Sequence, residues 1–164
     1  GAIEKGTWVY GDNFQNWGIV QTHSNIAGCP DELSFYLSEG HWSGTSQVLR
    51  RHSLRTDGFV SINADGTGGE LVTVPIVFSG DALTLNLETS ANGGARVELQ
   101  DVGGKPLEGF DLDRCIDLFG DGLDVPVQWG QNRDLSTVAG RAIRLRIALR
   151  EADLYSLKFS HGTA

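Results

Sequence analysis

The sequence contains no methionine, few cysteines and prolines, and no long apolar run. Its 164 residues include 2 Cys, 4 Pro and no Met. Because an open reading frame starts with Met, we expect the chain to be a processed product or a module of a longer protein. No run of about 18 apolar residues occurs, so the sequence predicts no membrane-spanning helix.

Positive charge is also scarce. Thirteen Lys and Arg stand against 21 Asp and Glu, for a formal net charge of −8. An acidic chain does not attract phosphate backbones or anionic lipids at long range, so we expect neither nucleic acid nor a membrane as partner. Locally, Arg50, Arg51, Arg55 and the segment Arg144 to Arg150 are basic. They keep an acidic polysaccharide open as a ligand, although a neutral glycan is the first expectation.

Glycine is abundant, and apolar and polar residues alternate in many short segments. The chain has 22 Gly, and short alternating runs are separated by Gly, Asp and Asn clusters. Alternation is clearest where Ile143, Leu145, Ile147 and Leu149 share one face of a strand. The pattern predicts an all-β fold, specifically a two-sheet antiparallel, jelly-roll-like β-sandwich.

The expected organisation is a single domain with two parts. Residues 33–164 form the sandwich, and residues 1–32 are an N-terminal extension or strands added to it. Within the sandwich, Asn92-Gly93-Gly94 is expected to be a turn between two strands, 82–88 and 95–101.

The segment from Phe35 to Gly44 is the best candidate for ligand binding. It places Trp42 close to Glu39 and His41. An exposed aromatic ring stacks on the apolar face of a sugar, while charged side chains bond its hydroxyl groups. The alternative for each aromatic residue is packing in the core or in an interface. The candidate ligand-binding residues are Trp17, Tyr36, Glu39, His41, Trp42, Arg50, Arg51 and Trp129.

Two further features have alternative interpretations. Asn63, Asp65 and Glu70 supply oxygen atoms in a Gly-rich loop, which suits a structural calcium ion or a plain connection between strands. No other cofactor is expected. Cys29 and Cys115 form either a disulfide or two unpaired thiols.

Catalytic motifs are missing from the sequence. It has no G-x-S-x-G nucleophile elbow and no H-E-x-x-H zinc motif, so we assign no catalytic residue. Paired carboxylates for glycoside cleavage come from distant strands, so the sequence leaves a small β-sandwich glycosidase or lyase open.

Several segments of the chain carry a joint resemblance to a known family. They are 49–64, 69–73, 86, 89–91, 96–100, 109–110 and 152–156, together with 17–22 and 30–34. As a set they resemble a bacterial module, the C-terminal β-sandwich that follows five-bladed β-propeller domains similar to glycoside hydrolase family 32. Segments 17–22 and 30–34 look like the join between propeller and sandwich, and the resemblance covers about residues 17 to 159.

The resemblance implies an ancillary, non-catalytic module of a secreted or periplasmic carbohydrate-active enzyme. Some relatives of this sandwich bind fructan or other glycans, and the catalytic carboxylates lie in the propeller. The expected partners are therefore a polysaccharide or oligosaccharide and a catalytic propeller domain. A purely structural role, in which the module stabilises the propeller, is the main alternative.

Overall fold

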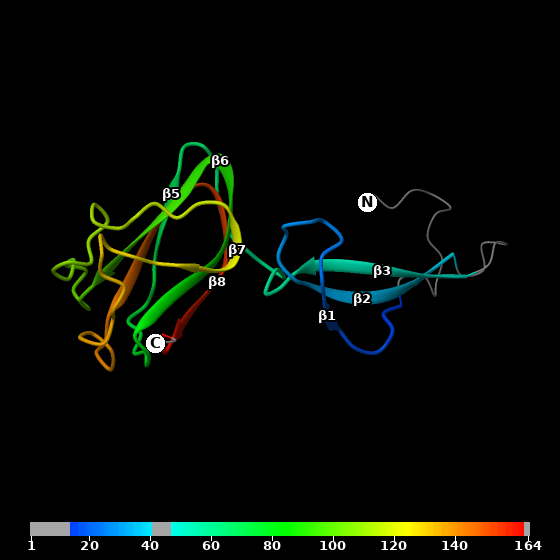
Figure 1. Ribbon diagram of the computed structural model, residues 1–164, viewed down its shortest axis with the longest axis horizontal. Coiled ribbons are helices and arrows are strands. Elements are labelled where there is room, and N and C mark those ends of the chain that lie inside the picture. The colour runs from blue at the N-terminus through cyan, green and yellow to red at the C-terminus, as the bar shows by residue number, and fades with distance from the viewer. Residues whose placement is uncertain (1–13, 41–46, 163–164) are drawn as a thin grey trace. The chain divides into compact units, whose positions relative to one another are not determined.

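The computed structural model describes residues 14–40 and 47–162 of the chain (Figure 1). These residues form eight strands in two antiparallel sheets and contain no helix, so none crosses a membrane as a helix. The all-β, antiparallel prediction is confirmed. The chain divides into two compact units, residues 1–58 and 59–164, here called the N-terminal and C-terminal units. The boundary expected between residues 32 and 33 falls inside the N-terminal unit. That the two units belong to a single domain remains a prediction.

The N-terminal unit contains a three-stranded sheet. Its strands are β1 (Val20–Thr22), β2 (Glu32–Glu39) and β3 (Val48–Arg55), in the order β1-β2-β3. Among its described residues no apolar side chain is buried, and the two that are buried are Ser34 and Ser38. This sheet therefore lacks an apolar core in the part of the chain that the structure describes.

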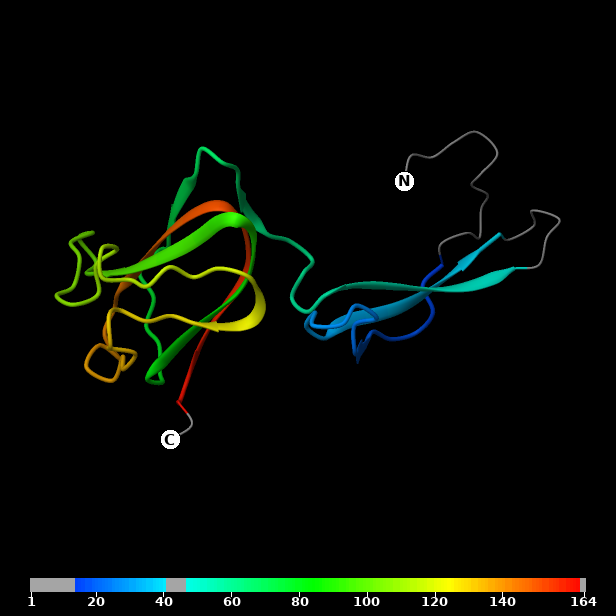
Figure 2. The same cartoon turned by 45° about the horizontal axis from the view of Figure 1, so that its top comes forward.

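The C-terminal unit is built on two long strands. Its strands are β4 (Ile62–Ala64), β5 (Gly69–Val72), β6 (Ala82–Gln100), β7 (Asp121–Pro126) and β8 (Arg144–Ser160). β6 and β8 pair in two stretches, 82–89 with 152–160 and 94–100 with 144–150. β4 and β7 flank the first stretch, and β5 flanks the second. In Figure 2 the ribbons of β6 (green) and β8 (orange to red) are both strongly curved.

A bend divides each long strand into its two stretches. The register of β6 and β8 shifts between Thr89 and Gly94, opposite Glu151, which has a φ of 43°. A β-bulge bends a strand in this way without ending it. The prediction of a turn at Asn92-Gly93-Gly94 is therefore wrong, because β6 continues through these residues.

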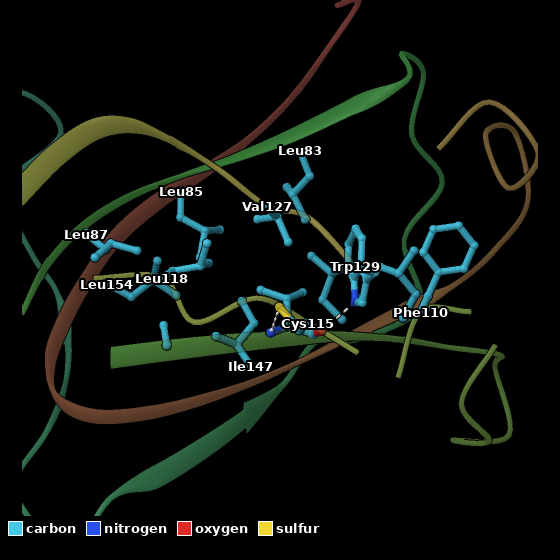
Figure 3. Packing of buried hydrophobic residues seen from close by; sticks show 14 of the residues in the cluster. Leu83, Leu85, Leu87, Phe110, Cys115, Leu118, Val127, Trp129, Ile147 and Leu154 are labelled. Atoms are coloured by element: carbon cyan, nitrogen blue, oxygen red, sulfur yellow. Dashed lines mark hydrogen bonds between the residues drawn. The ribbon is translucent and has the colours of Figure 1, made fainter. Parts of the chain in front are cut away.

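The core lies between the two stretches of the bent sheet (Figure 3). Leu83, Leu85 and Leu87 from the first stretch of β6 are at most 1% exposed, and so are Leu145 and Ile147 from β8. Apart from Asn86, which is also buried, their neighbours along each strand are partly or fully exposed, which confirms the predicted alternation. Burial of these side chains is the main stabilising contribution to the unit, at about 1.5–3 kcal/mol for each fully buried Leu or Ile.

Both cysteines are free thiols, of which Cys29 is exposed and Cys115 is buried. The Cys115 sulfur accepts a hydrogen bond from the Val97 amide at 3.2 Å, and burial raises the pKa of this thiol. Because the thiolate is the reactive form, Cys115 is protected from thiol reagents.

We expect a thiol reagent to modify one cysteine per folded chain and two after denaturation. Rapid modification of both in the folded protein would contradict the buried position of Cys115.

Candidate functional site

A cleft of about 910 Å³ lies at the bend of the C-terminal unit. We call it the bend cleft. Its volume is at the upper end of the range typical of small-ligand sites. β6 and β8 contribute residues 91–96 and 148–151, while Gly66, Asp117 and Phe119 come from the connecting segments. Arg96 and Ala148 are register partners on adjacent strands, as are Gly94 and Arg150. The cleft therefore rests on the outer face of the sheet, opposite the core.

An exposed ion pair forms one part of the cleft lining. Asp117 accepts two hydrogen bonds from Arg96, at 2.5 Å from Nε and 3.1 Å from Nη2. The Arg96 guanidinium holds the pKa of the Asp117 carboxyl below its ordinary value. The side chains are 44% exposed for Arg96 and 62% for Asp117, so the pair contributes little to folding stability. Asp117 is thus an ionised, accessible acceptor in the cleft.

The bend itself supplies further polar groups. Arg150 donates from Nη2 to the backbone oxygen of Asn92 at 2.8 Å. Glu151 accepts a hydrogen bond from the Ser90 hydroxyl, and its backbone amide donates to the Asp65 oxygen at 3.0 Å. These bonds hold two charged side chains at the position where β6 and β8 change direction. A cleft with a few fixed polar groups is the usual form of a specific ligand site.

Phe119 is the aromatic residue of the cleft, and its side chain is 73% exposed. The adjacent segment is fixed to β6 by the reciprocal hydrogen bonds of Ala95 and Leu118 and by the Thr89 amide, which donates to the Gly120 oxygen. Leu118 is buried while Phe119 points outward, as expected for consecutive residues of extended chain. The cleft therefore combines an accessible apolar ring with charged hydrogen-bonding groups.

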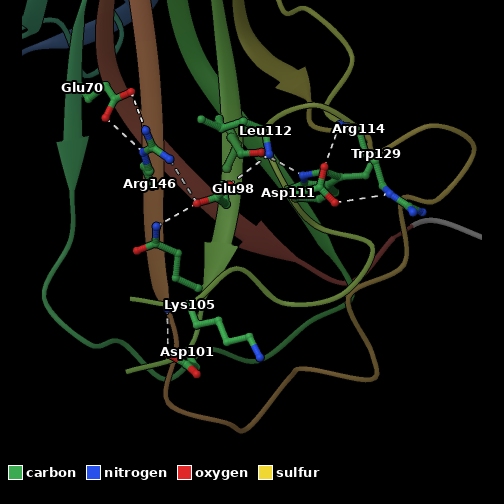
Figure 4. Close-up of polar contacts among 11 residues, drawn as sticks. Glu70, Glu98, Asp101, Lys105, Asp111, Leu112, Arg114, Trp129 and Arg146 are labelled. Atoms are coloured by element: carbon green, nitrogen blue, oxygen red, sulfur yellow. Dashed lines mark hydrogen bonds and ion pairs between the residues drawn. The ribbon is translucent and has the colours of Figure 1, made fainter. Parts of the chain in front are cut away.

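A polar network continues along the same outer face of the sheet (Figure 4). Arg146 donates two hydrogen bonds to Glu70 and one to Glu98, which is buried. Glu98 also accepts from Gln100 and from the Leu112 amide. Arg146 is thus neutralised by two carboxylates. The segment from Arg144 to Arg150 is therefore less basic than the sequence indicates.

The candidate residues of the N-terminal unit separate onto two faces of its sheet. Arg51 donates to Ser34, Thr22 and Glu32 and is the register partner of Tyr36. Arg50 donates to Glu39 at 2.6 Å instead. Because consecutive strand residues point to opposite faces, Tyr36 lies with Arg51 and Glu39 lies with Arg50. The described candidates of this unit therefore do not form one cluster.

The four candidate tryptophan and histidine residues have different positions. Trp17 is completely exposed, and His41 and Trp42 lie outside the described residues. Trp129 is 3% exposed, donates from Nε1 to the Val97 oxygen at 2.8 Å, and packs edge-on against Phe110. The structure therefore gives Trp129 a packing role in place of the ligand-stacking role expected from the sequence.

The three calcium candidates have other partners. Asp65 accepts hydrogen bonds from the amide and hydroxyl of Thr67, Asn63 donates to Asp153, and Glu70 pairs with Arg146. The loop after Asp65 joins β4 to β5, which pair with different stretches of β8. Within residues 14–40 and 47–162, no group of three or more His, Cys, Asp or Glu side chains is placed to hold a metal ion.

Sequence reasoning missed the bend cleft. Arg96 and Asp117 are separated by 21 positions, and Arg150 is 58 positions from Asn92, so no local motif joins them. The local signal at this site is the pair Gly93 and Gly94 next to Asn92, from which the sequence predicts a turn. A Gly pair in a strand also marks a bulge or a close backbone approach, and that interpretation points to this site.

Comparison of the chain with protein-family models, curated proteins and solved structures finds no match.

Proposed function

We propose that this chain is a non-catalytic carbohydrate-binding module of a bacterial polysaccharide-degrading enzyme, and that the bend cleft is its glycan site. The observation that carries the proposal is the joint presence of exposed Phe119 and the Arg96–Asp117 pair in one cleft. An aromatic ring offers a stacking surface for the apolar face of a sugar, and charged groups bond its hydroxyls.

The proposal extends to the fold and the parent protein. We assign the C-terminal unit to the β-sandwiches of jelly-roll type, since the two stretches of its bent sheet enclose one core. The sequence resemblance supports a parent enzyme with a catalytic β-propeller that acts on polysaccharide. Because such a substrate lies outside the cytoplasm, we place the parent protein in the secreted or periplasmic fraction.

A second candidate function is structural support of the propeller, and the N-terminal unit favours it. Its described residues bury no apolar side chain, yet several are exposed: Phe14, Trp17, Ile19, Val20, Ile26, Tyr36, Val48 and Leu49. Exposed apolar residues in this number are typical of surfaces that contact another protein. In this alternative the N-terminal unit contacts the rest of the parent enzyme. The two roles are compatible, because they use different units.

Affinity electrophoresis of the full chain through gels that contain single polysaccharides tests the proposed function. We expect at least one of inulin, β-glucan, xylan and mannan to retard the folded chain, because the bend cleft offers both stacking and hydrogen bonding. Unchanged migration of a folded chain in every gel would overturn glycan binding and leave the structural role.

The same polysaccharides test the non-catalytic part of the proposal. We expect prolonged incubation with the chain to release neither reducing ends nor unsaturated sugars. Release of either product would replace the binding module with a small glycosidase or lyase. Glycan binding and its catalytic alternative are thereby separated with one set of substrates.

A further inference from the structure

The charged groups of the bend cleft cancel one another. Arg96 and Arg150 line it together with Asp117 and Glu151. Arg96 donates two hydrogen bonds to Asp117, and Arg150 donates one to the backbone oxygen of Asn92. The cleft therefore offers both hydrogen-bond donors and acceptors without an excess of positive charge.

Asp117 restricts which ligands can bind to Arg96, because it already accepts two hydrogen bonds from the guanidinium. The bidentate pair has fork geometry, in which both carboxylate oxygens meet the guanidinium. An anionic ligand would have to displace Asp117 from Arg96 or lie close to a second negative charge. Hydroxyl groups meet no such obstacle, because each carboxylate oxygen has more than one acceptor position.

Arg96 also keeps Asp117 in its acceptor form. The hydrogen bonds from the guanidinium lower the pKa of this carboxyl, and the nearby Arg150 charge acts in the same direction. At neutral pH the carboxylate accepts hydrogen bonds only. With 62% of its side chain exposed, Asp117 remains accessible to hydroxyl donors in the cleft.

We infer that the bend cleft selects neutral sugars, with Asp117 accepting hydrogen bonds from sugar hydroxyl groups and disfavouring uronic acid and sulfated sugars. This inference rests on the proposed function and adds the ligand class and the residue that determines it. The Asp117 carboxylate thus accepts hydrogen bonds from a neutral sugar and repels an anionic one. Specificity often combines an attractive contact with a repulsive one in this way.

The Asp117→Asn variant tests this inference, with Asp124→Asn as its matched control. Asp124 forms an ion pair with Lys158 in which both side chains are 59% exposed, and it lies outside the cleft lining. Both variants remove one carboxylate from an exposed pair, so we expect each to unfold within a few degrees of the wild type. Thermal unfolding checks that both remain folded.

Retardation is measured in gels with neutral polysaccharides and in gels with polygalacturonate or dextran sulfate, at low and at physiological salt. We expect the wild-type chain to bind a neutral polysaccharide with little dependence on salt and not to bind the polyanions. Asp117→Asn should lose about tenfold in affinity for the neutral polymer and gain retention by the polyanions, since Arg96 loses its partner. Asp124→Asn should behave as the wild type in every gel.

The outcomes separate this inference from the proposed function. Salt-sensitive binding of the wild-type chain to a polyanion alone would overturn the neutral ligand class and leave glycan binding intact. Equal affinity of the wild-type and Asp117→Asn chains for the neutral polymer would overturn the role of Asp117. Binding of neither class by the wild-type chain would overturn the proposed function itself.

Discussion

Replacement of Phe119 by alanine should weaken glycan binding about tenfold and leave the fold intact. The side chain is 73% exposed in the bend cleft, so its removal creates no core cavity. An aromatic residue that anchors a ligand contributes about 1–2 kcal/mol or more to binding, which corresponds to roughly a 5- to 30-fold change in Kd. Titration calorimetry with the polysaccharide that retards the wild-type chain most strongly measures this change.

Phe59→Ala is the matched control for this experiment. Phe59 belongs to the same unit and is 67% exposed, but it does not line the cleft. We expect its variant to bind glycan as the wild type does. Loss of affinity in both variants, or in Phe59→Ala alone, would show that stacking in the bend cleft does not account for binding. Phe119→Trp should preserve or increase the affinity, because the larger ring offers more stacking surface.

Replacement of Gly93 by alanine should destabilise the C-terminal unit by about 2 kcal/mol. A Cβ atom at this position would lie 2.3 Å from the Glu151 oxygen and 2.8 Å from the Arg150 oxygen. Both are backbone atoms, so no side-chain rotation relieves the overlap. The bend of β6 against β8 would have to open. We expect thermal unfolding to show a decrease in Tm of roughly 10 °C.

Gly94→Ala distinguishes this close approach from a general effect of alanine in the strand. At Gly94 the nearest atom to an added Cβ is the Leu118 oxygen at 3.4 Å, which is an ordinary contact distance. We therefore expect the Gly94 variant to unfold within a few degrees of the wild type. A similar Tm for both variants would mean that the backbone contact at Gly93 does not hold the bend.

Much of the C-terminal unit follows from local patterns. Leu83, Leu85 and Leu87 occupy alternate positions, as do Leu145 and Ile147, and all five are buried as the alternation predicts. This prediction succeeds because residues two apart in a strand share a face whatever the strand pairs with. The same reasoning fails at Asn92-Gly93-Gly94. There a local turn signal occurs inside a strand whose path is maintained by pairing with a distant one.

The candidate site was harder to predict than the fold class. Aromatic and charged residues at positions 36, 39, 50 and 51 are close in sequence, yet the register of β2 and β3 divides them between two faces. Trp129 is of a residue type that often stacks on sugars, but its ring is buried and its indole nitrogen donates a hydrogen bond to the Val97 backbone oxygen. Exposure and facing direction depend on tertiary contacts, so residue type alone does not identify the site.

By itself the sequence determined the all-β class, the antiparallel alternation and which residues of the alternating strands, such as Leu145 and Ile147, face the core, because side-chain direction in a strand has a period of two residues. The tertiary structure alone decided that β6 and β8 each pass through both stretches of one bent sheet. It also decided that Arg96 meets Asp117 beside Phe119 and Arg150. These contacts depend on pairing between residues such as Gly94 and Arg150, far apart in the chain, and no local pattern encodes such a partner.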